Sequence, residues 1–177
     1  MTEQIRSPRF LVLTILIVCA ALTRALPLLI PHIWNFTAVG ALAIFSGAQF
    51  SDKRLAFVMP LAAMALSDLF IGNGFSMVVY VAFTAMVLCG FLIRKKVNVA
   101  NIALSSIAGA LVFFLITNFA LLYPVTQYPH NMQGIIASYI AALPFLNNMV
   151  VGNLLFSGVL FGSFYFLEKR YPVLINR

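Results

Sequence analysis

The sequence predicts an all-α integral membrane protein: one membrane domain, residues 1–177, with six transmembrane helices and both termini in the cytoplasm. Hydrophobic residues make up 63% of the chain and charged residues 8%, whereas soluble domains contain about 25% charged residues. Six crossings place every Lys and Arg except Arg24 on one side of the membrane, as in cytoplasmic segments. The net charge of +7 therefore reflects topology, and we expect no nucleic-acid partner.

The first three predicted spans follow one another with short polar turns between them. Residues 10–30 form an apolar run long enough to cross the bilayer. Residues 36–50 form the second span, which is short for the roughly 20 residues that a crossing needs. Asn35 or Thr37 could cap the start of its helix. Residues 55–71 form the third span, which ends at a glycine-rich break.

The second half of the chain predicts three further spans and one shorter piece. Residues 75–93 form the fourth span, which a basic cluster closes, and residues 99–122 form the fifth. Residues 134–143 are apolar but too short to cross, and Pro144 follows them, so we expect a half-helix there. Residues 145–167 form the sixth span.

Asp68 is an acid near the end of the third span, with no base beside it in the sequence. Arg24 lies in the first span at a matching depth, since each residue is about 20 Å from the cytoplasmic boundary of a core about 30 Å thick. An ionisable residue inside a membrane span indicates a functional site with a charged partner. The other interpretation is an ion pair that only fastens the first helix to the third.

Other polar and aromatic residues are predicted at the same outer level. Together they predict an outward-facing, aromatic-lined cup above an apolar inner half. The predicted ligand-binding residues are Arg24, Asn35, Asp68, Tyr80, Asn118, Tyr128, Asn147 and Asn148. Because the outer loops contain no Lys, Arg, Asp or Glu, we expect a small ligand that is neutral or zwitterionic.

Catalytic and metal-binding patterns are not found in the sequence. The two histidines, His32 and His130, lie in outer loops, and the chain has no metalloprotease, serine-hydrolase or nucleotide-binding motif. We therefore expect a protein that is not an enzyme and that holds no metal or cofactor.

Small residues recur four positions apart in several spans, a spacing that lets helices approach closely in lipid. These pairs are Ala21 and Ala25, Ala43 and Gly47, Ser105 and Gly109, and Gly158 and Gly162. They predict either close packing within the chain or a docking face for a separate membrane subunit.

Several longer motifs resemble a family of small bacterial membrane proteins described as transport proteins and similar to the substrate-binding (S) components of energy-coupling factor transporters. They are residues 35–48 (NFTAVGALAIFSGA), 67–72 (SDLFIG), 113–119 (FFLITNF), 143–148 (LPFLNN) and 160–162 (LFG), with Tyr128-Pro129 and Gly134 between them.

The resemblance implies a vitamin-binding subunit in the bacterial inner membrane, which docks to a shared membrane subunit driven by a pair of ATPases. It also implies that Ala21 and Ala25 take part in that docking, although Arg24 lies between them. Two other functions stay open: a carrier or channel for a small solute that works alone, and a membrane assembly protein without a transport role.

Overall fold

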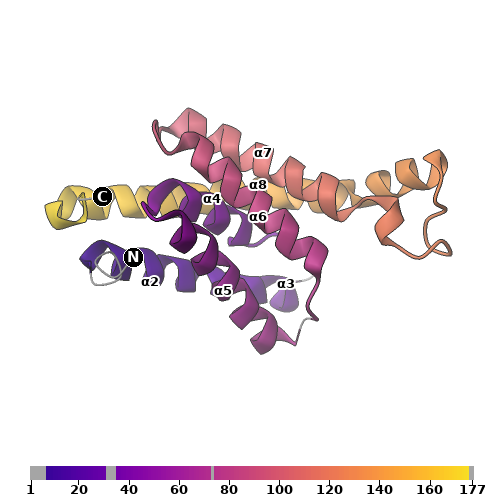
Figure 1. Cartoon of the computed structure of the whole chain (residues 1–177), viewed down its shortest axis with the longest axis horizontal. Helices are drawn as coiled ribbons and strands as arrows, with labels where there is room; N and C mark the ends of the chain where they lie inside the picture. The colour runs from indigo at the N-terminus through magenta and orange to yellow at the C-terminus, as the bar shows by residue number, and fades with distance from the viewer. Residues whose placement is uncertain (1–6, 31–34, 73, 176–177) are drawn as a thin grey trace.

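The computed structural model describes residues 7–30, 35–72 and 74–175, without the side chains of residues 26 and 27. The elements found in these residues are all helices (Figure 1). In chain order they are α2 (Pro8–Leu22), η1 (Thr23–Ala25), α3 (Leu26–Leu29), α4 (Val39–Gln49), α5 (Lys53–Ile71), α6 (Met77–Ile93), α7 (Val99–Thr117), η2 (Ala120–Leu122), α8 (Met132–Arg170) and η3 (Pro172–Leu174).

Four helical segments among the described residues are long and apolar enough to cross a membrane: Pro8–Ala25, Lys53–Ile71, Val99–Thr117 and Met132–Arg170. Two shorter apolar helices, α4 and α6, complete the bundle. The chain is therefore an all-helical protein of membrane character. The full count of six crossings stays a prediction, because α4 has 11 residues and is only about 16 Å long.

The short helix α4 forms the centre of the bundle, and all 11 of its residues are buried. It packs against α6 where Gly47 meets Gly90. A Cβ added to Gly47 would lie 2.2 Å from the Val87 carbonyl oxygen, so the two backbones touch at this crossing. The small residues of α4 thus serve close packing within the chain, which is one of the two uses that their spacing predicts.

One end of the bundle collects both termini and the turns between α4 and α5 and between α6 and α7 (Figure 1). Arg9, at the start of α2, forms an ion pair of 2.5 Å with Glu168, near the end of α8. Arg94, at the end of α6, donates to the carbonyl oxygen of Phe50, directly after α4. The basic segments that the sequence assigns to one side therefore lie together, at what we call the basic end.

Helix α8 corrects the prediction of a half-helix over residues 134–143 that is separate from the sixth span. The helix runs without interruption through Pro144 and contains 39 residues, which corresponds to about 58 Å. A proline removes one backbone donor, but membrane helices tolerate this loss where neighbouring groups compensate. Since a bilayer core is about 30 Å thick, α8 is longer than the crossing that residues 145–167 would need.

The first predicted span is also divided. The α-helix ends at Leu22, where Thr23 donates its hydroxyl to the Ala20 carbonyl oxygen, and a 3₁₀ turn follows. The same hydroxyl oxygen accepts the backbone N–H of Ala38, the N-cap of α4. The expected cap from Asn35 or Thr37 is therefore wrong, because a hydroxyl from another segment takes its place.

Candidate functional site

Asp68 lies in the last turn of α5, and Figure 1 shows this end of the helix away from the basic end. The helix stops there because Gly72 adopts a left-handed conformation, with φ of 75°, and donates its backbone N–H to the Asp68 carbonyl oxygen. A left-handed glycine after the last helical residue is a common helix stop. The carboxylate is thereby held at a helix C-terminus, where the helix dipole disfavours a negative charge unless a cation is near.

The cation comes from the turn that interrupts the first span. Arg24 sits in η1, and its Nη2 atom lies 2.5 Å from Oδ1 of Asp68. Its Nη1 atom donates to Oγ of Ser67 at 3.1 Å and to the Met64 carbonyl oxygen at 3.3 Å. The predicted contact between Arg24 and Asp68 is confirmed, and the guanidinium also neutralises the carbonyl end of α5.

Tyr80 reaches the same carboxylate from the first turn of α6. Its hydroxyl donates to Oδ2 of Asp68 at 3.0 Å, so that the two carboxylate oxygens have different partners. The ring of Phe75 lies against the ring of Tyr80, with centroids 4.8 Å apart. Tyr80 therefore joins α5 to α6 while it orients Asp68.

A cavity of about 200 Å³ opens beside these three side chains. It is lined by Arg24, Met64, Asp68, Gly74, Ser76, Val79 and Tyr80. The side chains of Arg24 and Asp68 retain 15% and 10% of their exposure, so the pair is reached from this cavity although it is mostly buried. We call these seven residues the outer site.

The outer site offers a cation, an anion, a phenol and a hydroxyl within one small volume. Such a set can bind a ligand that carries both an acidic and a basic group, because each ligand charge finds an opposite charge on the protein. Arg24 is suited to a carboxylate, since its planar guanidinium can hold two oxygen atoms at once. The described residues contain no group of three or more His, Cys, Asp or Glu side chains that could hold a metal ion.

The structure leaves the other predicted ligand-binding residues outside this cavity. Asn118 caps the end of its own helix, since its Nδ2 atom donates to the Phe114 carbonyl oxygen at 2.9 Å. Tyr128 packs edge-on against Tyr123, with ring centroids 5.4 Å apart. Burial, and to a smaller extent Tyr128, raise the pKa of Tyr123. These residues form the connection between α7 and α8, at the tip of a projecting hairpin (Figure 1).

Three asparagines are the remaining predicted ligand-binding residues that do not line the outer site. Asn35 is exposed and has φ of 64°, in the segment before α4. Asn147 is exposed and Asn148 is half-buried, both on α8. The single cup expected from these depths is therefore not formed as one cavity. Residues at similar depth along their helices point in different directions around the bundle.

Sequence reasoning missed two hydroxyls: Ser76, which lines the outer site, and Ser67, which contacts Arg24 beside it. Ser67 accepts from Arg24 and donates its own hydroxyl to the Met64 carbonyl oxygen at 2.8 Å. The position of Ser67 in the sequence indicated that it lies near the ion pair. It is the residue before Asp68 on the same helix, and adjacent helical side chains point in directions 100° apart around the axis. Ser76 lies at the start of the predicted fourth span and is the N-cap residue of α6, and its position in the sequence carried no such signal.

Ala21 and Ala25, the predicted docking pair on the first helix, lie in different surroundings. Ala21 is buried in the core of the chain, so it packs within the protein instead of presenting a docking surface. Ala25 is half-buried in η1, next to Arg24. By contrast, Gly158 on α8 is exposed, and nothing lies within 4 Å of a Cβ added there or at Gly162.

Comparison with known proteins adds one finding to this geometry. No curated protein and no solved structure matches the chain. A sequence profile of one family matches residues 4–174, which is nearly the whole chain. The protein therefore belongs to the family of unknown function DUF6580.

Proposed function

We propose that the protein is the substrate-binding membrane component of an uptake system for a small molecule, and that its ligand binds at the outer site. One observation carries this proposal: the Arg24–Asp68 ion pair, with Tyr80 on its second carboxylate oxygen, faces a cavity instead of being enclosed by protein. Ionisable side chains within membrane helices are costly, and they commonly mark substrate or ion pathways.

The size and charge of the outer site narrow the class of ligand. The cavity volume of about 200 Å³ is below the roughly 300–1,000 Å³ of sites that enclose a drug-sized molecule. The outer site therefore fits a small zwitterion, or the charged end of a larger vitamin-like metabolite. Arg24 receives the ligand's acidic group, and Asp68 receives its basic group.

The location of the site agrees with uptake across the bacterial inner membrane. The outer site lies where α5 ends and α6 begins, and Figure 1 shows these helix ends away from the basic end; basic segments face the cytoplasm. A ligand would then enter from outside. Energy for accumulation would come from a partner membrane subunit and its ATPases, as the resemblance to energy-coupling factor transporters implies.

The test is mass spectrometry of small molecules that co-purify with the wild-type protein and with Asp68→Asn. We expect the wild type to retain a metabolite and the variant to lose at least nine-tenths of it, with a melting temperature lowered by only a few degrees. Normal retention together with a much lower melting temperature would show that the pair serves folding alone.

Asp52→Asn is the matched control, because it makes the same chemical change at the other end of the same helix. Asp52 accepts the backbone N–H groups of Arg54 and Leu55 as the N-cap of α5, and asparagine caps helices about as well. The control variant should keep the metabolite. Uptake into liposomes by the purified protein alone, without any ATPase, would favour the self-sufficient carrier instead.

A further inference from the structure

A second and larger cavity lies near the basic end, between the first half of α7 and the second half of α8. Its volume is about 850 Å³. It is lined by Gln49, Arg94, Lys95, Val97, Asn98, Val99, Ile102, Ala103, Ser106, Leu154, Gly158, Phe161, Gly162, Phe164, Tyr165 and Glu168. None of these residues belongs to the outer site. We call this cavity the inner groove.

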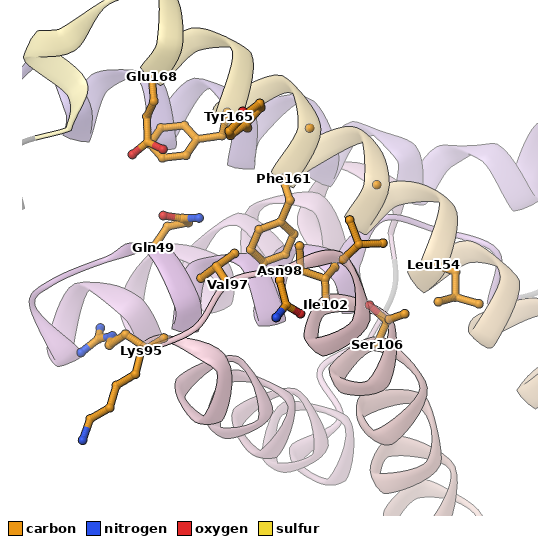
Figure 2. Close-up of a pocket in the computed structure, with 16 residues that line it drawn as sticks. Gln49, Lys95, Val97, Asn98, Ile102, Ser106, Leu154, Phe161, Tyr165 and Glu168 are labelled. Carbon is orange, nitrogen blue, oxygen red and sulfur yellow. The ribbon is translucent and has the colours of Figure 1, made fainter.

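The inner groove is polar at one end and apolar along the rest of its length. Figure 2 shows Gln49, Glu168 and Lys95 toward one end, whereas Phe161, Ile102 and Leu154 extend away from them. Val99, Leu154 and Tyr165 are exposed, so the groove is open along its side. A groove of this kind fits an amphiphile with one charged end and an apolar body.

The charge of the polar end favours an anion. Glu168 is already paired with Arg9 at 2.5 Å, which offsets its negative charge. Lys95 adds a positive charge, and it forms no ion pair with any described residue. The start of α7, capped by Asn98, adds the partial positive charge of a helix N-terminus. The polar end is therefore net positive.

The apolar part of the groove follows from two glycines on α8. Gly158 and Gly162 are one helical turn apart, and no atom lies within 4 Å of a Cβ added to either. Their lack of side chains leaves open space along the helix, with the ring of Phe161 and the side chain of Ile102 beside it (Figure 2). In a membrane this space is reached sideways, from the hydrocarbon region.

We propose that the inner groove binds one anionic phospholipid. Its phosphate lies near Lys95, and an acyl chain lies along Gly158 and Gly162. Basic pockets between helices at a membrane surface are suited to anionic headgroups, and each Lys or Arg near the surface contributes about 1 kcal/mol. An acyl chain also keeps water from the exposed walls of the groove, which a soluble anion would not do.

Native mass spectrometry of the full-length protein tests the headgroup contact. The probe is an equal mixture of dioleoyl phosphatidylglycerol and dioleoyl phosphatidylcholine in detergent micelles. We expect the wild type to prefer the anionic lipid and Lys95→Gln to reduce that preference about fivefold. Lys96→Gln is the matched control, because Lys96 is the next residue, is exposed and does not line the groove. Equal losses in both variants would overturn the headgroup assignment.

Gly158→Leu tests the acyl-chain contact by filling the groove. We expect it to lower the binding of both lipids at least tenfold while the melting temperature stays near that of the wild type, since the added side chain enters open space. Ala108→Leu adds similar bulk at an exposed position of α7 that does not line the groove, and it should leave lipid binding unchanged.

Two results would assign the groove to a different occupant. If Gly158→Leu converts a dimer to a monomer without changing lipid binding, the groove is an interface with a second copy of the chain. If excess inorganic phosphate displaces the anionic lipid from the wild type, the polar end recognises a free anion and the acyl contact is not required. Either result contradicts the proposal without affecting the outer site.

Discussion

Two arginine–carboxylate pairs lie in different parts of this bundle, and their surroundings differ in a way that separates structure from function. Arg9 and Glu168 meet at the basic end, and Arg24 and Asp68 meet at the outer site. Both ion pairs have the same distance of 2.5 Å. The difference lies in what else each guanidinium contacts and in how exposed each arginine is, since the Arg9 side chain is 3% exposed and the Arg24 side chain is 15% exposed.

Arg9 is enclosed by protein. Its side chain is 3% exposed, and it donates to the side chain and carbonyl oxygen of Gln49 and to the carbonyl oxygen of Leu174, besides Glu168. The ring of Phe164 lies 4.7 Å below its guanidinium. This network joins the beginning of α2, the end of α4 and the end of the chain, so its consequence is stability.

Arg24 has fewer enclosing contacts and more access. It donates to Ser67 and to one backbone carbonyl of α5, and a cavity of about 200 Å³ lies beside it. A ligand or water can therefore approach the Arg24–Asp68 pair without any rearrangement of the helices. Glu168 also lines a cavity, the inner groove, so the comparison depends on the two arginines: Arg24 lines a cavity, whereas Arg9 is enclosed by protein.

The largest stability loss is expected from Arg9→Met. The change leaves buried carbonyl oxygens and Glu168 without their donor, and breaking a buried pair costs about 3 kcal/mol or more of unfolding free energy. We expect the melting temperature in detergent to fall by about 8 °C, with the co-purified metabolite retained. Arg54→Met, at an exposed base of the same end, should leave the melting temperature unchanged. A loss of the metabolite in Arg9→Met would contradict the division of roles.

Arg24→Met should show the opposite pattern. Asp68 is mostly buried, but the cavity beside it can admit water to the remaining carboxylate, so the unfolding free energy should fall by about 2 kcal/mol, less than in Arg9→Met. The co-purified metabolite should nevertheless be lost. Thermal melting and mass spectrometry on the same preparations measure both quantities. If the stability loss equals that of Arg9→Met, the two pairs are equivalent and the comparison fails.

A double variant that exchanges the two charges tests whether ligand binding needs only an ion pair or also needs each charge at its own position. The double variant Arg24→Asp/Asp68→Arg restores an ion pair, so it should be about 1 kcal/mol more stable than the sum of the single changes predicts. It should not recover the metabolite, because a zwitterion would meet each charge in the wrong place. Recovery of binding would indicate that the site recognises charge without orientation.

The Arg24–Asp68 contact was predictable because sequence position indicates both that Asp68 needs a charged partner and which residue can supply it. An acid in an apolar run needs a partner, and the rise per residue of a helix places Arg24 at the matching depth. The Arg9–Glu168 contact was not predicted, since Arg9 and the residues around Glu168 look like the basic flanks of any membrane helix. The depth of a residue in the membrane also could not predict on which side of the bundle each asparagine lies. Depth gives the position along the helix axis and not the direction in which the side chain points.

The helix boundaries also could be predicted only in part from the sequence. Apolar runs predicted α5 and α6 to within two residues at each end: residues 55–71 became Lys53–Ile71, and residues 75–93 became Met77–Ile93. Pro144 predicted an end for a helix that continues through it. The effect of one proline depends on whether neighbouring elements support the chain on both sides, which sequence spacing does not report. The inner groove was missed for a related reason, because spacing does not show where two helices separate.

The smallest effect is expected from Tyr80→Phe, which removes one hydroxyl from the outer site. The phenol donates to Asp68 at 3.0 Å, and a hydrogen bond of this kind contributes about 1 kcal/mol. Retention of the co-purified metabolite should fall about fivefold, because Asp68 loses the group that orients its second oxygen. Tyr171→Phe, at an exposed tyrosine beyond α8, is the control and should change nothing. If both variants retain the metabolite equally, Tyr80 only joins α5 to α6, and Arg24 and Asp68 alone define the polar part of the site.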